Sequence, residues 1–193
     1  MSGGIGLISV RKSLEEIKLD SLGLLSWTCD PFAGEAGGAT LTSQQVYFSA
    51  IPVRAGMNIT GLVFSVAVAA AGTTPTTIKA GLYSTAFARL GLSANVAAAS
   101  YWTAAVAFVQ VPLTATYPVT SEGLLYGAFL QDGSWGTTQM QITRNGLQNA
   151  TYATGPISGY PVMSSRQGGQ TDLPATATFN TTLNQAPMWM GIY

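Results

Sequence analysis

The sequence predicts an all-β protein: an antiparallel β-sandwich of jelly-roll-like type, preceded by a short N-terminal α-helical attachment segment. Three observations support this prediction. From Thr40 onward the chain is rich in Thr, Ala, Ser, Val and Gly, and apolar residues occupy alternating positions. Turn residues interrupt these stretches about every dozen residues, which is typical of a sandwich or a barrel. No stretch between them has the helical period that a parallel βαβ unit requires.

Charge divides the chain into two parts. Residues 1–35 carry eight of the sixteen charged side chains, and the rest of the chain carries the other eight. Gly34, Gly37 and Gly38 supply a flexible joint directly after the charged part. We therefore expect an attachment segment at residues 1–39 and a β-sandwich domain at residues 40–193.

The attachment segment contains the one predicted helix, over residues 13–25. Ser13 and Glu16 have the spacing of a capping box, in which each side chain satisfies the backbone amide of the other residue. Apolar residues follow the spacing of one helical face, at Val10, Leu14, Ile17 and Leu24. A short helix is marginally stable alone. This stripe must therefore pack either on its own domain or on a partner, and the sequence favours neither.

The expected strands of the sandwich are runs of alternating apolar residues bounded by turn residues. They cover residues 44–51, 58–70, 78–85, 106–113, 124–131, 137–143 and 188–193. Strand 58–70 alternates most clearly, with Leu62, Phe64 and Val66 directed to one face. Residues 87–105 are expected to be an irregular connection. Pro112 is expected either to end its strand or to place that strand at a sheet edge. The apolar last strand predicts that its residues are held in a sheet.

Composition argues against several classes of function. Charged residues make up 8% of the chain and the formal net charge is +0, so there are too few cations for a nucleic-acid interface. With no histidine and a single cysteine, Cys29, the common His- and Cys-based catalytic and metal sites cannot form. We therefore expect a protein that is not an enzyme, with no catalytic residues, no metal and no cofactor.

The carboxylates outside the N-terminal segment do not form a glycosidase pair. They are Glu122, Asp132 and Asp172. Glu122 and Asp132 flank one strand, which places them about 25–30 Å apart, far beyond the separation of two catalytic carboxylates. We interpret all three as solvated loop acids.

The sequence predicts neither a membrane helix nor a signal peptide. Its longest uncharged apolar run, residues 59–71, is shorter than the roughly 20 residues that a spanning helix needs. Residues 1–10 lack the early cationic region of a signal peptide. We therefore expect no membrane insertion and synthesis in a reducing cytoplasm.

Aromatic side chains are the remaining candidates for recognition. Trp135, Tyr152 and Tyr160 lie in or near predicted loops, where flat rings with polar edges stack on sugars or contact proteins. The alternative is that such rings cover the ends of the core, and for Trp102 this packing role is the favoured interpretation. Trp135, Tyr152 and Tyr160 are thus the candidate glycan or receptor contacts.

The low charge also favours self-association. A monomer with so few charges exposes a large uncharged surface and is poorly soluble, unless Thr, Ser, Asn and Gln side chains make that surface polar or other subunits bury it. The outward positions of strand 58–70 carry small uncharged residues, and such a face desolvates at little cost because no ion loses its water. We therefore expect a subunit contact centred on Ala67 and Ala69.

Six short segments occur in an order that resembles a known family. They are residues 59–64, the turn at 72–77, and residues 79–83, 93–96, 111–114 and 123–126. In this order they resemble the β-sandwich modules of minor tail, tail-fibre and related virion appendage proteins of tailed bacteriophages, especially those of actinobacterial phages. The resemblance covers roughly residues 40–147. Residues 148–193 match nothing that we can name.

The resemblance implies a non-enzymatic virion protein that forms a homotrimer. Its N-terminal helix would attach it to other virion proteins, and its sandwich would face outward, toward host-surface carbohydrate. One alternative is a capsid decoration or head-fibre subunit without a receptor, and another is a free carbohydrate-binding module that uses the three candidate aromatic residues. The two virion functions predict stable oligomers, whereas a free module should be a monomer. Fold analogy does not choose between tail and head, because function belongs to sites rather than folds.

Overall fold

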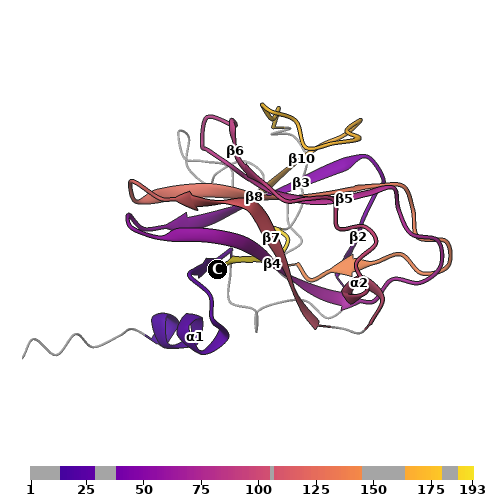
Figure 1. The fold of residues 1–193 in the computed structure, drawn as a ribbon, viewed down its shortest axis with the longest axis horizontal. Coiled ribbons are helices and arrows are strands. Elements are labelled where there is room, and N and C mark those ends of the chain that lie inside the picture. Colours follow the sequence, from indigo (N-terminus) through magenta and orange to yellow (C-terminus); the bar gives the residue numbers. More distant parts are fainter. Residues whose placement is uncertain (1–13, 29–37, 105–106, 145–163, 180–186) are drawn as a thin grey trace, which may run out of the picture.

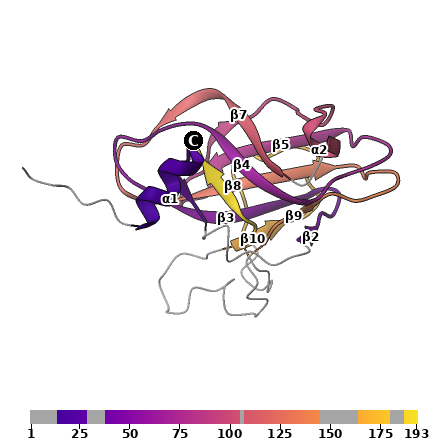
Figure 2. The same cartoon turned by 90° about the horizontal axis from the view of Figure 1, so that it is seen from below.

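Two antiparallel β-sheets pack face to face in the computed structural model (Figure 1 and Figure 2). The structure describes residues 14–28, 38–104, 107–144, 164–179 and 187–193. Every strand pair within the two sheets is antiparallel. The predicted all-β antiparallel sandwich is confirmed.

The five-stranded sheet has the order β10-β3-β8-β5-β6. Its strands are β10 (Ser164–Gln167), β3 (Gln45–Val53), β8 (Gly123–Asp132), β5 (Thr77–Tyr83) and β6 (Arg89–Leu92). The long central pairing joins β3 to β8 without a break, from Gln45 opposite Gln131 to Val53 opposite Gly123. The two edge strands, β10 and β6, are each only four residues long.

The six-stranded sheet is organised around one long strand. Its strands are β1 (Ser26–Trp27), β11 (Met190–Ile192), β4 (Asn58–Val68), β9 (Gln141–Ile142), β2 (Ala39–Thr40) and β7 (Ala107–Pro118). Along one side β4 pairs with β7, and along its other side it pairs first with β11 and then with β9. β7 is therefore an edge strand, which is one of the two outcomes expected of Pro112, and it continues past Pro112 to Pro118 instead of ending there.

Alternation along the strands builds the core between the sheets. Leu62, Phe64 and Val66 of β4 are fully buried there, which confirms the predicted inward face. Phe64 meets Phe129 of the other sheet edge to face, with ring centroids 4.9 Å apart. At one end Trp102, in the short helix α2 (Tyr101–Ala104), covers the core. Its indole N–H donates to the Val96 carbonyl at 2.8 Å, so Trp102 has the packing role that the sequence favours.

The strand bounds differ from the prediction where local signals are weak. β3 continues through Pro52 to Val53. On the side of β3 that faces β10, pairing is limited to residues 46–49, so no hydrogen bond of the sheet requires the N–H that Pro52 lacks. Residues 87–105, expected to be irregular, contain both β6 and α2. Strand 137–143 is reduced to the two residues of β9. The last strand is confirmed as β11.

The N-terminal helix, α1, spans Leu14–Leu22 and ends at Gly23. Gly23 has a φ of 67°, and the Leu24 N–H donates to the Leu19 carbonyl at 2.9 Å, which is the signature of a Schellman C-cap. Leu24 therefore lies after the helix and not on its apolar stripe. Leu14 and Ile17 lie in α1, whereas Val10 is outside the described residues.

The sheet extends to the N-terminal side of the expected boundary at residue 40. Ser26 and Trp27 form β1 and pair with β11. Leu24 and Trp27 are buried in a small cluster with Val63 and Trp189. A chain that begins at Thr40 would lose this cover, so a truncation that tests the attachment segment must keep residues 24–28.

In the described part of the chain, no helix has the length and apolar character that crossing a membrane requires.

Candidate functional site

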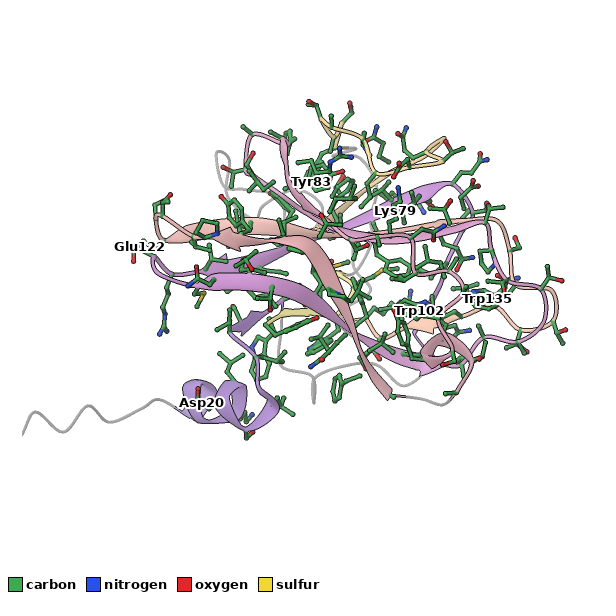
Figure 3. The ribbon with its side chains drawn as sticks, viewed as in Figure 1. Asp20, Lys79, Tyr83, Trp102, Glu122 and Trp135 are labelled. Atoms are coloured by element: carbon green, nitrogen blue, oxygen red, sulfur yellow. The ribbon has the colours of Figure 1, made fainter. Side chains whose placement is uncertain are left out.

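The candidate recognition aromatics do not form a surface site among the described residues. Trp135 is only 2% exposed, and its indole N–H donates to Gln131 Oε1 at 3.2 Å. This bond holds the ring against Gln131 near the end of β8, and Figure 3 shows Trp135 at the end of the sandwich away from Glu122. The expectation of a glycan contact at Trp135 is therefore wrong, and the ring covers the core instead. Tyr152 and Tyr160 lie outside the described residues.

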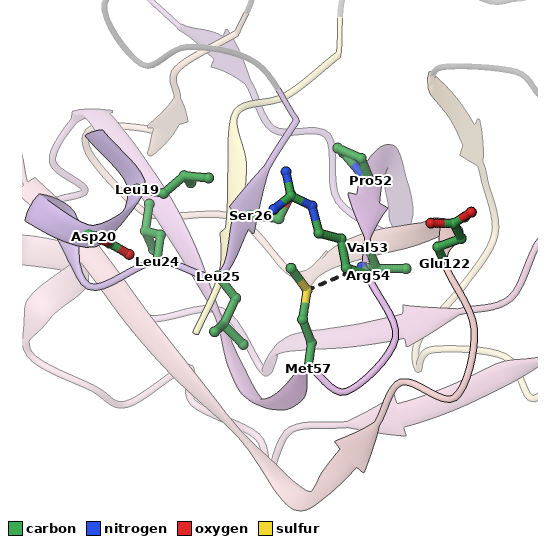
Figure 4. A pocket seen from close by; sticks show the side chains of 11 residues that line it. Leu19, Asp20, Leu24, Leu25, Ser26, Pro52, Val53, Arg54, Met57 and Glu122 are labelled. Atoms are coloured by element: carbon green, nitrogen blue, oxygen red, sulfur yellow. Dashed lines mark hydrogen bonds between the residues drawn. The ribbon is translucent and has the colours of Figure 1, made fainter. Parts of the chain in front are cut away.

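The end of the sandwich opposite Trp135 carries a cleft of about 790 Å³ (Figure 4). It lies between the α1–β1 connection, the β3–β4 turn and the β7–β8 turn. Leu25 and Met57 lie in its middle, with Asp20 on one side and Glu122 on the other. Its lining residues are Leu19, Asp20, Leu24, Leu25, Ser26, Pro52, Val53, Arg54, Met57, Glu122 and Gly123.

The chemistry of this cleft suits contact with a protein segment. Its floor is apolar, and Asp20, Arg54 and Glu122 add both signs of charge. Within the described residues, no group of three or more Cys, Asp or Glu side chains is placed to hold a metal ion. Apolar contact with a mixed polar rim is the usual composition of a protein–protein contact.

A second hollow lies on the outer face of the six-stranded sheet, beside the end of α1. It has a volume of about 110 Å³ and is lined by Leu22, Leu24, Val63, Phe108 and Gln110. Phe108 is 51% exposed and Leu22 is 38% exposed, and no other large apolar side chain in the described ranges is as open to solvent. Two exposed apolar side chains beside one hollow are typical of an interaction surface. We call this surface, defined by Leu22, Val63, Phe108 and Gln110, the β4–β7 face.

The chain itself covers the centre of this sheet. Trp189 is fully buried and packs with Leu24, Trp27 and Val63. Phe108 lies against Trp189, with ring centroids 5.1 Å apart, and leaves its other side exposed. The β4–β7 face is thus the uncovered margin of an apolar cluster, and Phe108 is its most prominent side chain.

The strands under this face carry no charge. Neither β4 nor β7 contains Asp, Glu, Lys or Arg. The polar group next to Val63 on β4, the Ser65 hydroxyl, is already paired with Thr143 Oγ1 at 2.8 Å. Contact with a partner would therefore bury apolar and amide groups without stripping water from an ion.

The predicted subunit contact lies further along β4. Ala67 and Ala69 are both half-buried. Ala67 lies at a β-bulge, where the pairing of β4 with β9 shifts between Val66 and Val68, and Ala69 follows the last residue of the strand. A bulge twists a strand and makes its surface less flat. The exposed apolar area therefore lies closer to Phe108 than to these two alanines.

The outer face of the five-stranded sheet differs, because residues 168–179, which follow its edge strand β10, cover it. Phe179 lies against Phe48 and Tyr126, with centroid distances of 4.6 Å to each ring. Tyr83 Oη donates to the Pro174 carbonyl at 2.7 Å, and Arg89 Nη1 donates to the Leu173 carbonyl. We call residues 168–179 the cover segment.

Burial and pairing shift the pKa values of three side chains, those of Tyr83 and Tyr126 under the cover segment and that of Asp172 within it. Burial raises the pKa of Tyr126 to about 12 and the pKa of Tyr83 further still. Partial burial opposes ionisation of Asp172, but hydrogen bonds from Lys79 Nζ at 2.8 Å and from the Leu173 N–H at 2.7 Å outweigh it. The pKa of Asp172 therefore lies below its ordinary value of 3.8.

Sequence reasoning missed Phe108 and the cover segment for different reasons. Phe108 occupies an outward position on an uncharged edge strand, and this combination was visible as a signal of self-association. The cover segment has no such signal, because it is polar and mostly irregular and its partners are distant in the sequence.

Comparison with protein-family models, with curated proteins and with solved structures found no match.

Proposed function

We propose that this protein is a non-enzymatic structural subunit of a bacteriophage virion. Its most favoured place is a minor tail, tail-tip or fibre appendage, where copies associate through the β4–β7 face. The observation that carries the self-association is the uncharged sheet face with the half-exposed Phe108 beside an apolar hollow.

Energetics favours burial of this face. Burying apolar surface contributes about 25 cal/mol per Å². A phenylalanine that is half exposed therefore has roughly 1 kcal/mol still to gain from a partner. In each copy, burial of Leu22 would add to the free energy gained from Phe108. Because β4 and β7 carry no charged residue, no cost of desolvating an ion on these strands reduces this gain.

The virion role rests on the resemblance in sequence. Four of its six segments fall on β4, β5, β7 and β8, whose buried side chains help to build the core between the two sheets. These segments therefore bear on the framework of the domain and not on a ligand site. The attachment of residues 1–22 to other virion proteins, and contact with host carbohydrate through Tyr152 or Tyr160, belong to the same proposal.

Location on the particle tests the virion role. Purified virions of the phage that encodes this chain are labelled with an antibody against it and viewed by electron microscopy, with an antibody against the major capsid protein as control. We expect label on the tail. Label on the capsid would support the decoration or head-fibre alternative, and absence from the particle would contradict both.

A turnover assay tests the non-enzymatic role. The purified protein is incubated with glycan and ester substrates, and we expect no hydrolysis. Hydrolysis that disappears in Glu122→Gln or in Asp172→Asn would overturn this part of the proposal.

A further inference from the structure

The direction of the backbone groups on β4 is given by its contacts with β11 and β9. Gly61 exchanges hydrogen bonds with Tyr193, since its N–H donates to the Tyr193 carbonyl and its carbonyl accepts from the Tyr193 N–H. The Ser65 carbonyl accepts from the Thr143 N–H. Gly61, Val63 and Ser65 therefore direct their backbone groups away from β7, because alternate residues of a strand point to the same side.

The register then identifies the backbone groups of β7 that no other described strand pairs with. Phe108 lies opposite Ser65, Gln110 opposite Val63, and Pro112 opposite Gly61. In an antiparallel ladder both residues of such a non-bonded pair point outward. Phe108 and Gln110 thus direct their N–H and C=O groups to the open edge of the sheet. Pro112, which lacks an N–H, is tolerated at the same edge for this reason.

This edge differs from the others in the described part of the chain. β6 and β10 carry Arg89 and Arg166, and β1 and β2 are only two residues long. Short strands and charges are the usual means by which proteins prevent edge pairing. The free part of β7, residues 107–112, has neither protection. Beyond it, Leu113 bridges to Ser93 and Thr114 Oγ1 donates to the Leu92 carbonyl, so β6 covers the rest.

We propose that a second copy of this chain adds its β7 antiparallel to this edge, about a two-fold axis at Val109. Phe108 then lies opposite Gln110 of the second copy, and Gln110 opposite its Phe108. Each pair exchanges two backbone hydrogen bonds, which gives four across the contact. The pattern is self-complementary, as an isologous contact requires. The formal net charge of +0 means that the copies do not repel one another.

The side chains agree with this register. The Phe108 and Gln110 side chains of both copies lie on the β4–β7 face, so the pairing extends the apolar margin across the axis. This inference rests on the proposed self-association and specifies its geometry. It predicts a dimer or another even-numbered assembly, in place of the trimer that the resemblance implies.

A matched pair of substitutions tests the edge. Gln110→Pro removes one outward N–H without removing a bond to β4, whereas Gln110→Thr keeps that N–H. Analytical ultracentrifugation of the full chain should show wild type and Gln110→Thr at an even multiple of the 20.0 kDa of one chain. Gln110→Pro should shift to a single chain, with its thermal unfolding still cooperative. An unchanged mass for Gln110→Pro would overturn the pairing.

A cysteine cross-link covers the case in which Gln110→Pro fails to fold. Val109 opposite Val109 is a non-bonded pair, with Cα atoms about 4.5 Å apart, within the range of a disulfide. Val109→Cys in a Cys29→Ser chain should form a covalent dimer on oxidation, and Val111→Cys should not. A wild-type trimer, or no cross-link at position 109, would overturn this geometry; the trimer would leave the proposed self-association standing.

Discussion

The outer face of each sheet carries a phenylalanine, and the two rings differ in how far the rest of the chain buries them. Phe48 on the five-stranded sheet is 1% exposed, because the cover segment lies over it and Phe179 packs against its ring. Phe108 on the six-stranded sheet is 51% exposed, because α1 and β1 cover only its neighbours. One face is thus completed by the chain itself, and the other retains an apolar margin that a partner can complete.

The polar interactions at the two faces differ as well. The cover segment is held by the ion pair of Lys79 with Asp172, by Tyr83 and by Arg89. The described residues at the β4–β7 face contribute no charge from either strand. An ion pair and hydrogen bonds thus hold the cover segment on its sheet. The β4–β7 face instead has an uncharged, partly exposed apolar surface, which suits contact with a separate partner.

The largest expected effect comes from removing the ring under the cover segment. Phe48→Ala leaves a cavity between Tyr83 and Phe179, and we expect the free energy of unfolding to fall by about 3–5 kcal/mol. Denaturant unfolding measures this change. A loss below about 1 kcal/mol would mean that the cover segment does not bury this face as described.

Alkaline pH should release the cover segment next. Burial raises the pKa of Tyr126 to about 12, so the folded state favours the neutral phenol. This stabilisation is complete below the ordinary pKa of 10.0 and is lost as the pH rises through about 12. Circular dichroism and tyrosinate absorbance should change together in this range. Ionisation of all tyrosines near pH 10 with the fold intact would contradict the prediction, and Tyr126→Phe should reduce the sensitivity.

On the open face, the matched substitution should affect association more than folding. Phe108→Ala removes a half-exposed ring, and we expect a loss of about 1 kcal/mol in the free energy of unfolding. The same variant should dissociate at a higher concentration than wild type in ultracentrifugation. If Phe108→Ala costs as much stability as Phe48→Ala, the contrast between the two faces is wrong.

The smallest effect concerns the ion pair. Asp172 is 56% exposed, so Asp172→Asn should cost less than about 1 kcal/mol. Local opening should still increase, seen as faster hydrogen exchange of the Ala177 amide, which donates to Phe87. Because the pKa of Asp172 is depressed, its contribution is present above pH 3.8 and is lost as the pH falls below that value. Glu122→Gln is the control and should leave this amide unchanged.

Much of the framework could be predicted from the sequence. The alternation of Leu62, Phe64 and Val66 predicts a buried face, and Pro112 predicts a strand end or an edge position, of which the structure shows the edge. These predictions succeed because periodicity and proline act on the strand in which they lie.

The parts that failed depend on partners distant in the sequence. Trp135 is indistinguishable from a surface ring until the turn after Asp132 places it against Gln131. β1 and β10 exist because β11 and β3 pair with them, and strands this short have no period of their own. The alternating residues of β8 likewise do not show that its outer face is buried by the cover segment while its inner face is buried by the other sheet.

The mass of the wild-type chain in solution tests the central claim, self-association through the β4–β7 face, most directly. Light scattering from micromolar concentration upward should give a multiple of 20.0 kDa. Phe108→Asp should reduce it to a single chain with the fold intact, since a charge would then need to be desolvated in the contact. Ala67→Glu should do the same if the contact reaches the end of β4. A wild-type mass of 20.0 kDa at every concentration, or a Phe108→Asp oligomer as stable as wild type, would contradict the account.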